Sequence, residues 1–259
     1  MMLLSTKSWM IRKVKSFDLL DFRRYLKLHV TLCWVMLVKI IFYAIYYNLG
    51  ATVNDVVLSC FAGALRRYLK TNINTTPSEL PISMTFNSRS TKAKDMEQIP
   101  LGNHSGGVLL KLPVSIEDPM RRLEIVRDRI NNMKYSSHPH VFSWIYFALI
   151  SCLPEYFARI STFSIRDHCC LIFSNVPGPV KSLNINGKRI DSVIVIPPLH
   201  ADIGVVAAAF SYAGKLNLTV MTDQMVVADP DRLTKYFEEE VQLLGKKTSV
   251  VNWCRILND

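Results

Sequence analysis

The chain has 259 residues, of which 49% are hydrophobic and 20% charged, so it is long enough for a sizeable core and too apolar to be intrinsically disordered. Its formal net charge of +10 is uneven, because residues 1–27 carry seven basic and two acidic side chains. Basic residues beside an apolar run favour an anionic membrane surface, although a solvated basic tail explains them equally well. Zinc-finger spacing, ribonucleoprotein signatures and basic zippers are absent from the sequence, so no nucleic-acid partner is expected.

The N-terminal region divides into a basic lead-in over residues 1–30 and an apolar segment over residues 31–49. From Thr31 to Tyr47 the apolar run is broken only by Lys39, which would be costly near the centre of a bilayer. We therefore expect a buried or interfacial helix here, rather than a true membrane span. The expected location is membrane-associated, at the endoplasmic reticulum or the plasma membrane.

The next stretch predicts an amphipathic helix that begins just after Thr52. Apolar residues recur at helical spacing, namely Val53, Val56, Val57, Cys60, Phe61, Ala64, Leu65 and Tyr68. Thr52 and Asp55 have the spacing of a capping box. The apolar stripe does not explain Asn54 next to Asp55. An amide and a carboxylate at a helix start are more often caps than catalytic groups.

The remaining chain alternates between strands and helices. Predicted strands cover residues 82–86, 106–113, 169–173, 192–196, 204–212 and 216–221, with a hairpin turn at Asn186-Gly187. Asp118-Pro119 and Asp229-Pro230 each predict a helix start, and Gly245 is expected to end the second helix. Residues 142–153 are apolar but too short for a membrane span, which favours a buried helix. The pattern is an α/β sandwich with a mixed sheet.

Cysteine and histidine spacing argues against several kinds of catalytic site. None of the six cysteines forms a Cys-x-x-Cys pair, so buried free thiols in a reducing compartment are expected, and no metal site. None of the six histidines is adjacent to another or has an aspartate four residues later. A Gly-x-Ser-x-Gly elbow, a phosphate-binding glycine loop and a dinucleotide fingerprint are also absent from the sequence.

Three motifs resemble the wax ester synthase/diacylglycerol acyltransferase family and occur in that family's order. They are Thr52-Val-Asn-Asp-Val-Val-Leu-Ser59, Pro100-Leu-Gly-Asn103 and Ser174-Asn-Val-Pro-Gly-Pro179. The likeness covers about residues 36 to 245 and only the C-terminal half of a family member. It implies the C-terminal half of a chloramphenicol acetyltransferase-like (CoA-dependent acyltransferase) fold over residues 50–245, followed by a tail over 246–259.

The resemblance also implies a reaction. Family members form triacylglycerol or wax esters from acyl-CoA and diacylglycerol or a long-chain alcohol, with acyl-CoA as a co-substrate and no other cofactor. Their general base lies in a His-His-x-x-x-Asp-Gly motif, which this sequence does not contain. We therefore expect a partial family member, either from a truncated gene model or as a natural half-protein. It would be inactive without an N-terminal acyltransferase half or a partner chain. The alternative is a noncatalytic lipid-binding, acyl-CoA-binding or interaction module.

The same motifs supply the expected site residues. Asn54 is expected to position the substrate as a donor and acceptor, and Asp55 to fix the local structure. Substrate contacts are expected from Gly102, Asn103, Ser174, Asn175, Pro177 and Gly178. The face turned toward the other half is expected to carry a large apolar patch.

Overall fold

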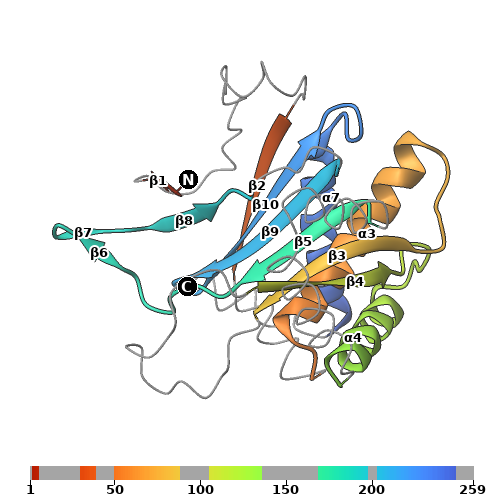
Figure 1. The fold of residues 1–259 in the computed structure, drawn as a ribbon, viewed down its shortest axis with the longest axis horizontal. Coiled ribbons are helices and arrows are strands. Elements are labelled where there is room, and N and C mark those ends of the chain that lie inside the picture. The colour runs from red at the N-terminus through yellow and green to blue at the C-terminus, as the bar shows by residue number, and fades with distance from the viewer. Residues whose placement is uncertain are drawn as a thin grey trace, which may run out of the picture.

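The structure is a computed structural model that describes residues 2–5, 30–38, 50–87, 105–135, 169–197 and 203–248. A six-stranded mixed sheet forms one layer; α3 (Val53–Asn72) and α7 (Pro230–Lys247) run behind it in Figure 1, and α4 (Pro119–Tyr135) lies near β4. The strands in spatial order are β2 (Val30–Val38), β10 (Lys215–Asp223), β9 (Val205–Tyr212), β5 (Leu171–Val176), β3 (Leu80–Asn87) and β4 (Ser105–Leu112). This confirms the predicted α/β sandwich with a mixed sheet. The helix predicted over residues 142–153 lies outside the described residues.

The centre of the sheet is parallel. β5 pairs in parallel with β3 on one side and with β9 on the other, whereas β4, β10 and β2 join antiparallel. β5 is therefore a central strand, as its continuous apolar sequence predicts. Parallel pairing also places the carboxyl ends of β3, β5 and β9 at the same end of the sheet.

The helix predicted over residues 31–49 is wrong for residues 31–38, which belong to the edge strand β2 (Val30–Val38). This strand pairs antiparallel with β10 from Val30↔Asp223 to Val38↔Lys215. Its valines, threonine and tryptophan suit a strand, and periodicity alone does not distinguish a short apolar strand from a buried helix. Residues 39–49 lie outside the described part. Among the described residues, no helix combines the length and apolar character that a membrane crossing requires.

Helix α3 (Val53–Asn72) begins where the sequence predicts. The Asp55 amide donates to Thr52 Oγ1 at 3.3 Å, and the Thr52 amide donates to Asp55 Oδ2 at 2.7 Å, which completes the capping box. The apolar stripe is buried from Val56 to Tyr68, and Val53 is half-buried. Phe61 packs against Phe173 of β5 with 6.3 Å between ring centroids, so α3 covers the centre of the sheet.

The helices α4 (Pro119–Tyr135) and α7 (Pro230–Lys247) pack beside α3. Asp118 and Asp229 cap them as predicted, each accepting from the backbone amide three residues later. Gly245 does not end α7, which continues to Lys247, so the predicted tail begins inside the helix. A glycine ends a helix when it takes positive φ, and Gly245 does not.

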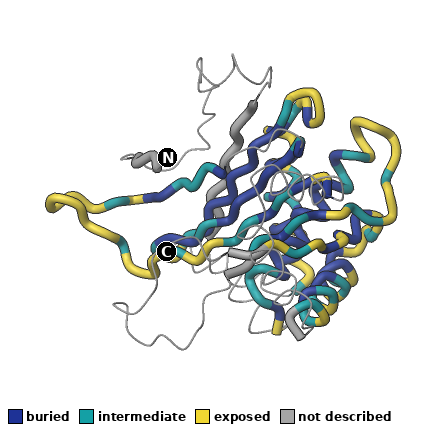
Figure 2. The backbone as a smooth tube through the Cα atoms, viewed as in Figure 1, coloured by how far each residue is buried: buried dark blue, intermediate teal, exposed yellow. Residues whose placement is uncertain are grey.

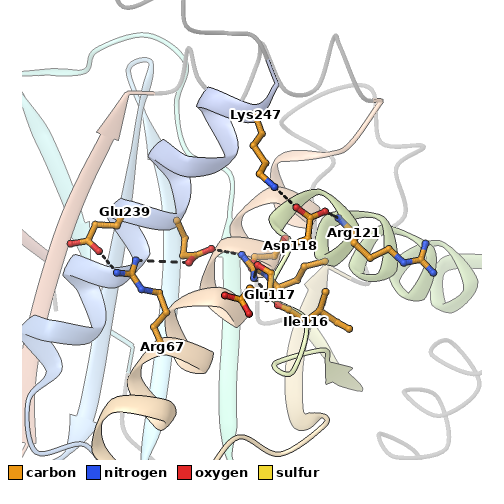
Figure 3. Close-up of polar contacts among 10 residues, drawn as sticks. Arg67, Ile116, Glu117, Asp118, Arg121, Glu239 and Lys247 are labelled. Atoms are coloured by element: carbon orange, nitrogen blue, oxygen red, sulfur yellow. Dashed lines mark hydrogen bonds and ion pairs between the residues drawn. The ribbon is translucent and has the colours of Figure 1, made fainter.

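A buried ion pair joins the three helices (Figure 3). The Arg122 guanidinium of α4, with a side chain 1% exposed, donates to the carboxylate of Glu240 on α7. It also donates to the carbonyls of Ser59 in α3 and Ile116, both at 2.9 Å. Gly63 lies against the pair, where a Cβ atom would come within 2.4 Å of both side chains. Each of the three guanidinium nitrogens of Arg122 therefore has an acceptor, which offsets part of the cost of burying the charges.

A hairpin projects from the sheet after β5 (Figure 1). We call residues 177–197 the hairpin arm. It contains the short strands β6 (Asn184–Ile185), β7 (Lys188–Arg189) and β8 (Ser192–Val195), and β8 pairs with β1 (Met2–Ser5). Asn186 and Gly187 have φ of 49° and 75°, as the predicted hairpin turn requires.

Candidate functional site

The candidate site lies where the N-terminal end of α3 meets the carboxyl ends of β3 and β5. Asn54 Nδ2 donates to Met84 Sδ of β3 at 3.3 Å, and Asn175 Nδ2 of β5 donates to Asn54 Oδ1 at 3.5 Å. Asn54 and Asn175 are half-buried. The fold therefore brings together two predicted site residues that are 121 positions apart in the chain.

Strand alternation places Ser174, the other predicted site residue on β5, on the opposite face of the sheet from Asn175. Met84 belongs to the core on the helix-covered face, whereas its neighbour Thr85 points to the opposite face. There Thr85 Oγ1 donates to Ser174 Oγ at 2.8 Å. Ser174 and Asn175 therefore serve different faces of the sheet, and only Asn175 meets Asn54.

The Asn54–Asn175 pair retains hydrogen-bonding capacity. A donor–acceptor distance of 3.5 Å is at the long limit for a hydrogen bond, so this contact is weak. A carboxamide carries two N–H donors and an oxygen with two lone pairs. The two side chains are therefore suited to orient a carbonyl or hydroxyl oxygen. An amide does not titrate near neutral pH, so the pair cannot serve as a general base.

Asp55 is enclosed beneath the helix start and is 1% exposed. One carboxylate oxygen accepts from the Thr52 amide, and the other has no hydrogen-bond partner within the described part of the chain. This placement agrees with a role in fixing the local structure. Any part that Asp55 plays in the reaction stays a prediction.

Gly178 is held against the end of β9. Its amide donates to Ser211 Oγ at 3.1 Å, and a Cβ atom here would lie 2.1 Å from the Ser211 carbonyl oxygen. Only glycine allows this approach. Pro177 is exposed beside it. Substrate contact by these two residues stays a prediction, and the predicted contacts Gly102 and Asn103 lie outside the described residues.

The described thiols are unsuited to nucleophilic catalysis. Burial raises the pKa of Cys60 to about 12, and desolvation also raises the pKa of Cys169 and of Cys170. All three therefore remain protonated at neutral pH. Cys60 and Cys169 are buried as expected, but Cys170, just before β5, is exposed.

The sequence reasoning missed Met84 and Thr85. Alternation along residues 80–87 could have assigned them to opposite faces, since Ile82 and Met84 share the apolar side. No local signal indicated that Met84 would contact Asn54.

Solved structures define the class of fold. A wax ester synthase/diacylglycerol acyltransferase from Marinobacter aquaeolei VT8 is 19% identical with a TM-score of 0.63, over 85% of this chain and 49% of that one. The epimerization domain from the third module of tyrocidine synthetase B is 10% identical with a TM-score of 0.54, over 94% and 52%. The chain thus has the fold of about half of a CoA-dependent acyltransferase-like protein.

Sequence comparison then gives the family. The model of the WS/DGAT C-terminal domain matches residues 101–245, more than half of the chain, so the chain belongs to this family. This confirms the resemblance carried by the three motifs. O-acyltransferase WSD from Acinetobacter baylyi is 29% identical over 198 residues, which are 76% of this chain and 42% of that protein. A Mycobacterium tuberculosis relative named as a diacylglycerol O-acyltransferase is 29% identical over 200 residues, 72% and 39% respectively. The chain spans about two fifths of the length of these relatives.

Proposed function

We propose that this chain supplies the C-terminal half of an acyl-CoA-dependent O-acyltransferase that esterifies diacylglycerol or a long-chain alcohol. The family match carries the proposal, and the relatives named as O-acyltransferases support it. The pair Asn54–Asn175 adds a chemical reason, because two amides converge where the start of α3 meets the carboxyl end of the parallel strand β5. The carboxyl ends of parallel strands are the usual place for ligand contacts in α/β proteins.

The proposed division of labour follows from the groups available. In acyl transfer the alcohol oxygen attacks the thioester carbonyl, the carbon–sulfur bond breaks, and a base passes the alcohol proton to the departing CoA thiolate. That base must lie within hydrogen-bond reach of the hydroxyl. The amides at this site cannot take the proton, and the sequence has no His-His-x-x-x-Asp-Gly motif. The base therefore comes from the other acyltransferase half, and this chain positions the reactants.

A membrane surface is the proposed place of action, at the endoplasmic reticulum or the plasma membrane. Its support is indirect. Acceptors with long alkyl chains partition into lipid, and residues 1–27 carry the excess of basic side chains that anionic lipid attracts. Co-sedimentation with vesicles containing phosphatidylserine, but not with neutral vesicles, is the expected result. Equal recovery in the supernatant with both would contradict this placement.

Reconstitution tests the proposed activity. The purified chain is mixed with the part of the Acinetobacter baylyi relative outside its matched region, and ester formation is followed with labelled acyl-CoA and diacylglycerol or hexadecanol. Turnover is expected only in the mixture. Asn54→Ala should lower kcat by roughly 100-fold or more, in line with the loss of a polarising donor.

Asn72→Ala is the matched control, because it makes the same change at the other end of α3, where Asn72 donates to the Tyr68 carbonyl. It should leave kcat unchanged. Equal losses from the two variants would contradict a role for Asn54 in the reaction. Binding of acyl-CoA without turnover in any mixture would favour the noncatalytic alternative, for which the lack of a base motif in this sequence is the supporting observation.

A further inference from the structure

Met84 determines which end of the Asn54 carboxamide faces the core. Asn54 Nδ2 lies 3.3 Å from Met84 Sδ. A thioether accepts hydrogen bonds and has no proton to donate. The N–H side of the carboxamide must therefore face the sulfur, because the amide oxygen in the same place would meet a second acceptor. Met84 is 4% exposed, so water has little access to the sulfur.

The second amide at the site cannot make this choice. Asn175 Nδ2 donates to Asn54 Oδ1 at 3.5 Å. A carboxamide offers both donors and an acceptor, so two facing amides can exchange these roles by turning over together. The thioether removes that freedom, since turning the Asn54 amide over would break its contact with Met84. One sulfur atom therefore sets the direction of both hydrogen bonds.

Packing fixes the place of the sulfur atom. In the sheet register Met84 lies between Val108 of β4 and Phe173 of β5, on the face that the helices cover. Phe173 is fully buried, and Val108 packs against the core. A methionine side chain is flexible, so it needs close neighbours to hold it in one place. The thioether thus combines an apolar surface that suits the core with one hydrogen-bond acceptor.

The backbone of Asn54 is held by the helix start. The capping box between Thr52 and Asp55 fixes the first turn of α3, in which Asn54 is the second residue. With the backbone and the amide end both held, the other N–H of Asn54 and the second lone pair of its oxygen point in set directions. Groups that are held in advance need not be ordered when reactants bind.

We propose that Met84 is a positioning residue for acyl transfer, which orients the Asn54 carboxamide, and through it that of Asn175, toward the reactants. Met84 acts through Asn54 and takes no part in the chemistry itself. A serine or threonine hydroxyl in its place could donate as well as accept, so it would leave the amide orientation unfixed. The inference rests on the proposed function and adds the residue that sets the direction of the hydrogen bonds at the site.

Nuclear magnetic resonance of the chain alone tests the contact. Met84→Leu removes the sulfur acceptor with little change in volume, and Met221→Leu makes the same change at a buried methionine of β10, which β9 separates from β5. Asn54→Ala identifies the side-chain amide signals of Asn54 by their loss. In Met84→Leu we expect these signals to shift and their protons to exchange several-fold faster, whereas in Met221→Leu both stay as in the unaltered chain. Unchanged signals and exchange in Met84→Leu would overturn the proposal.

Kinetics then test the positioning role, in the mixture of the chain with the remaining part of the Acinetobacter baylyi relative. We expect Met84→Leu to lower kcat roughly 3- to 10-fold, an effect typical of residues in contact, and Met221→Leu to leave it unchanged. In the Asn54→Ala background, Met84→Leu should lower kcat no further, because Met84 acts through Asn54. Equal losses in the two backgrounds would show a merely structural role and overturn the proposal. Circular dichroism melts verify that all variants fold.

The inference and the proposed function fail in different ways. A mixture with the unaltered chain that shows no turnover contradicts the proposed function, and the positioning role falls with it, whereas the resonance spectra still decide whether Met84 orients Asn54. Turnover that is normal in Met84→Leu contradicts the positioning role alone.

Discussion

We call the contact of α3, α4 and α7 around Arg122 and Glu240 the helix junction. The helix junction and the hairpin arm differ in how far their side chains are covered by partners within the chain. At the junction, Arg122 and Glu240 are almost fully enclosed, and every drawn contact in Figure 3 returns to the same three helices and the loop before α4. On the arm, Tyr212 and Asn217 hold the root through hydrogen bonds, while the side chains of Val180, Leu183 and Ile185 are exposed. The junction is complete by itself and stabilises the domain. The arm is anchored at its root, and much of the rest of it is exposed to solvent (Figure 2).

The largest expected effect is at the junction. Arg122→Ala leaves the Glu240 carboxylate buried without its main partner, so the free energy of unfolding should fall by about 3–5 kcal/mol. Urea denaturation measures it, with Arg121→Ala as the control, because Arg121 is exposed on the same helix. Combining Arg122→Met with Glu240→Leu should restore part of the loss. A loss as small as that of the control would show that the junction does not hold the helices together.

Gly63→Ala tests how tightly the helix junction is packed, through the sign of the change in the free energy of unfolding. In an isolated helix this substitution would stabilise by roughly 1 kcal/mol. Here the new methyl group would press on the Arg122–Glu240 pair, and neither side chain can move away without losing partners. We expect a net destabilisation of about 1–3 kcal/mol, as for other overpacked sites. Thermal melts give the sign directly, and a higher melting temperature would contradict the tight junction.

Tyr212→Phe tests the arm root with a smaller change. It removes one hydroxyl and leaves the Leu183 amide and the Ile190 carbonyl without their shared partner. The global free energy of unfolding should fall by about 1 kcal/mol. Hydrogen exchange at the Leu183 amide should accelerate, while amides of α3 keep their protection. Unchanged exchange at Leu183 would show that Tyr212 does not order the arm.

The smallest expected effect is at the surface, where Asp118 accepts from Lys247 and from the Arg121 amide. The hydrogen bond from Lys247, followed by that from Arg121, lowers the pKa of Asp118 in the folded chain. A lowered pKa adds stability above the unfolded value, about 3.9, and that stability is lost as pH falls through the folded value. Asp118→Asn retains a capping side chain and should flatten the stability profile in this acid window. The difference should shrink in 1 M salt, because the pair is exposed.

Local sequence signals predicted the helices well, because their starts depend on neighbours. The caps at Thr52, Asp118 and Asp229 act within three residues, and the buried stripes repeat within one helix. The edge strand β2 was mistaken for a helix because its partner β10 is far away in the sequence and supplies the hydrogen bonds that decide between the two structures. The burial of Arg122 and Glu240 could not be predicted either, since single charged residues in a helix indicate a surface position.

The sequence predicted which residues form the candidate site but not which of them contact one another. The family motifs selected Asn54, Ser174 and Asn175, yet only the parallel register of β3 and β5 places Asn175 against Asn54 and Ser174 against Thr85. The hairpin turn at Asn186-Gly187 was visible in the sequence. The anchoring of the arm was not, because Tyr212 and Asn217 belong to strands whose apolar pattern gave them no special role.

The central claim is that this chain positions reactants for a proton acceptor that another acyltransferase half supplies. The most direct measurement is ester formation by the purified chain alone, with labelled acyl-CoA and either diacylglycerol or hexadecanol. We predict no turnover above the rate without protein, and turnover once the other half is added. Robust turnover by the chain alone would contradict the claim, because it would require a base within these 259 residues.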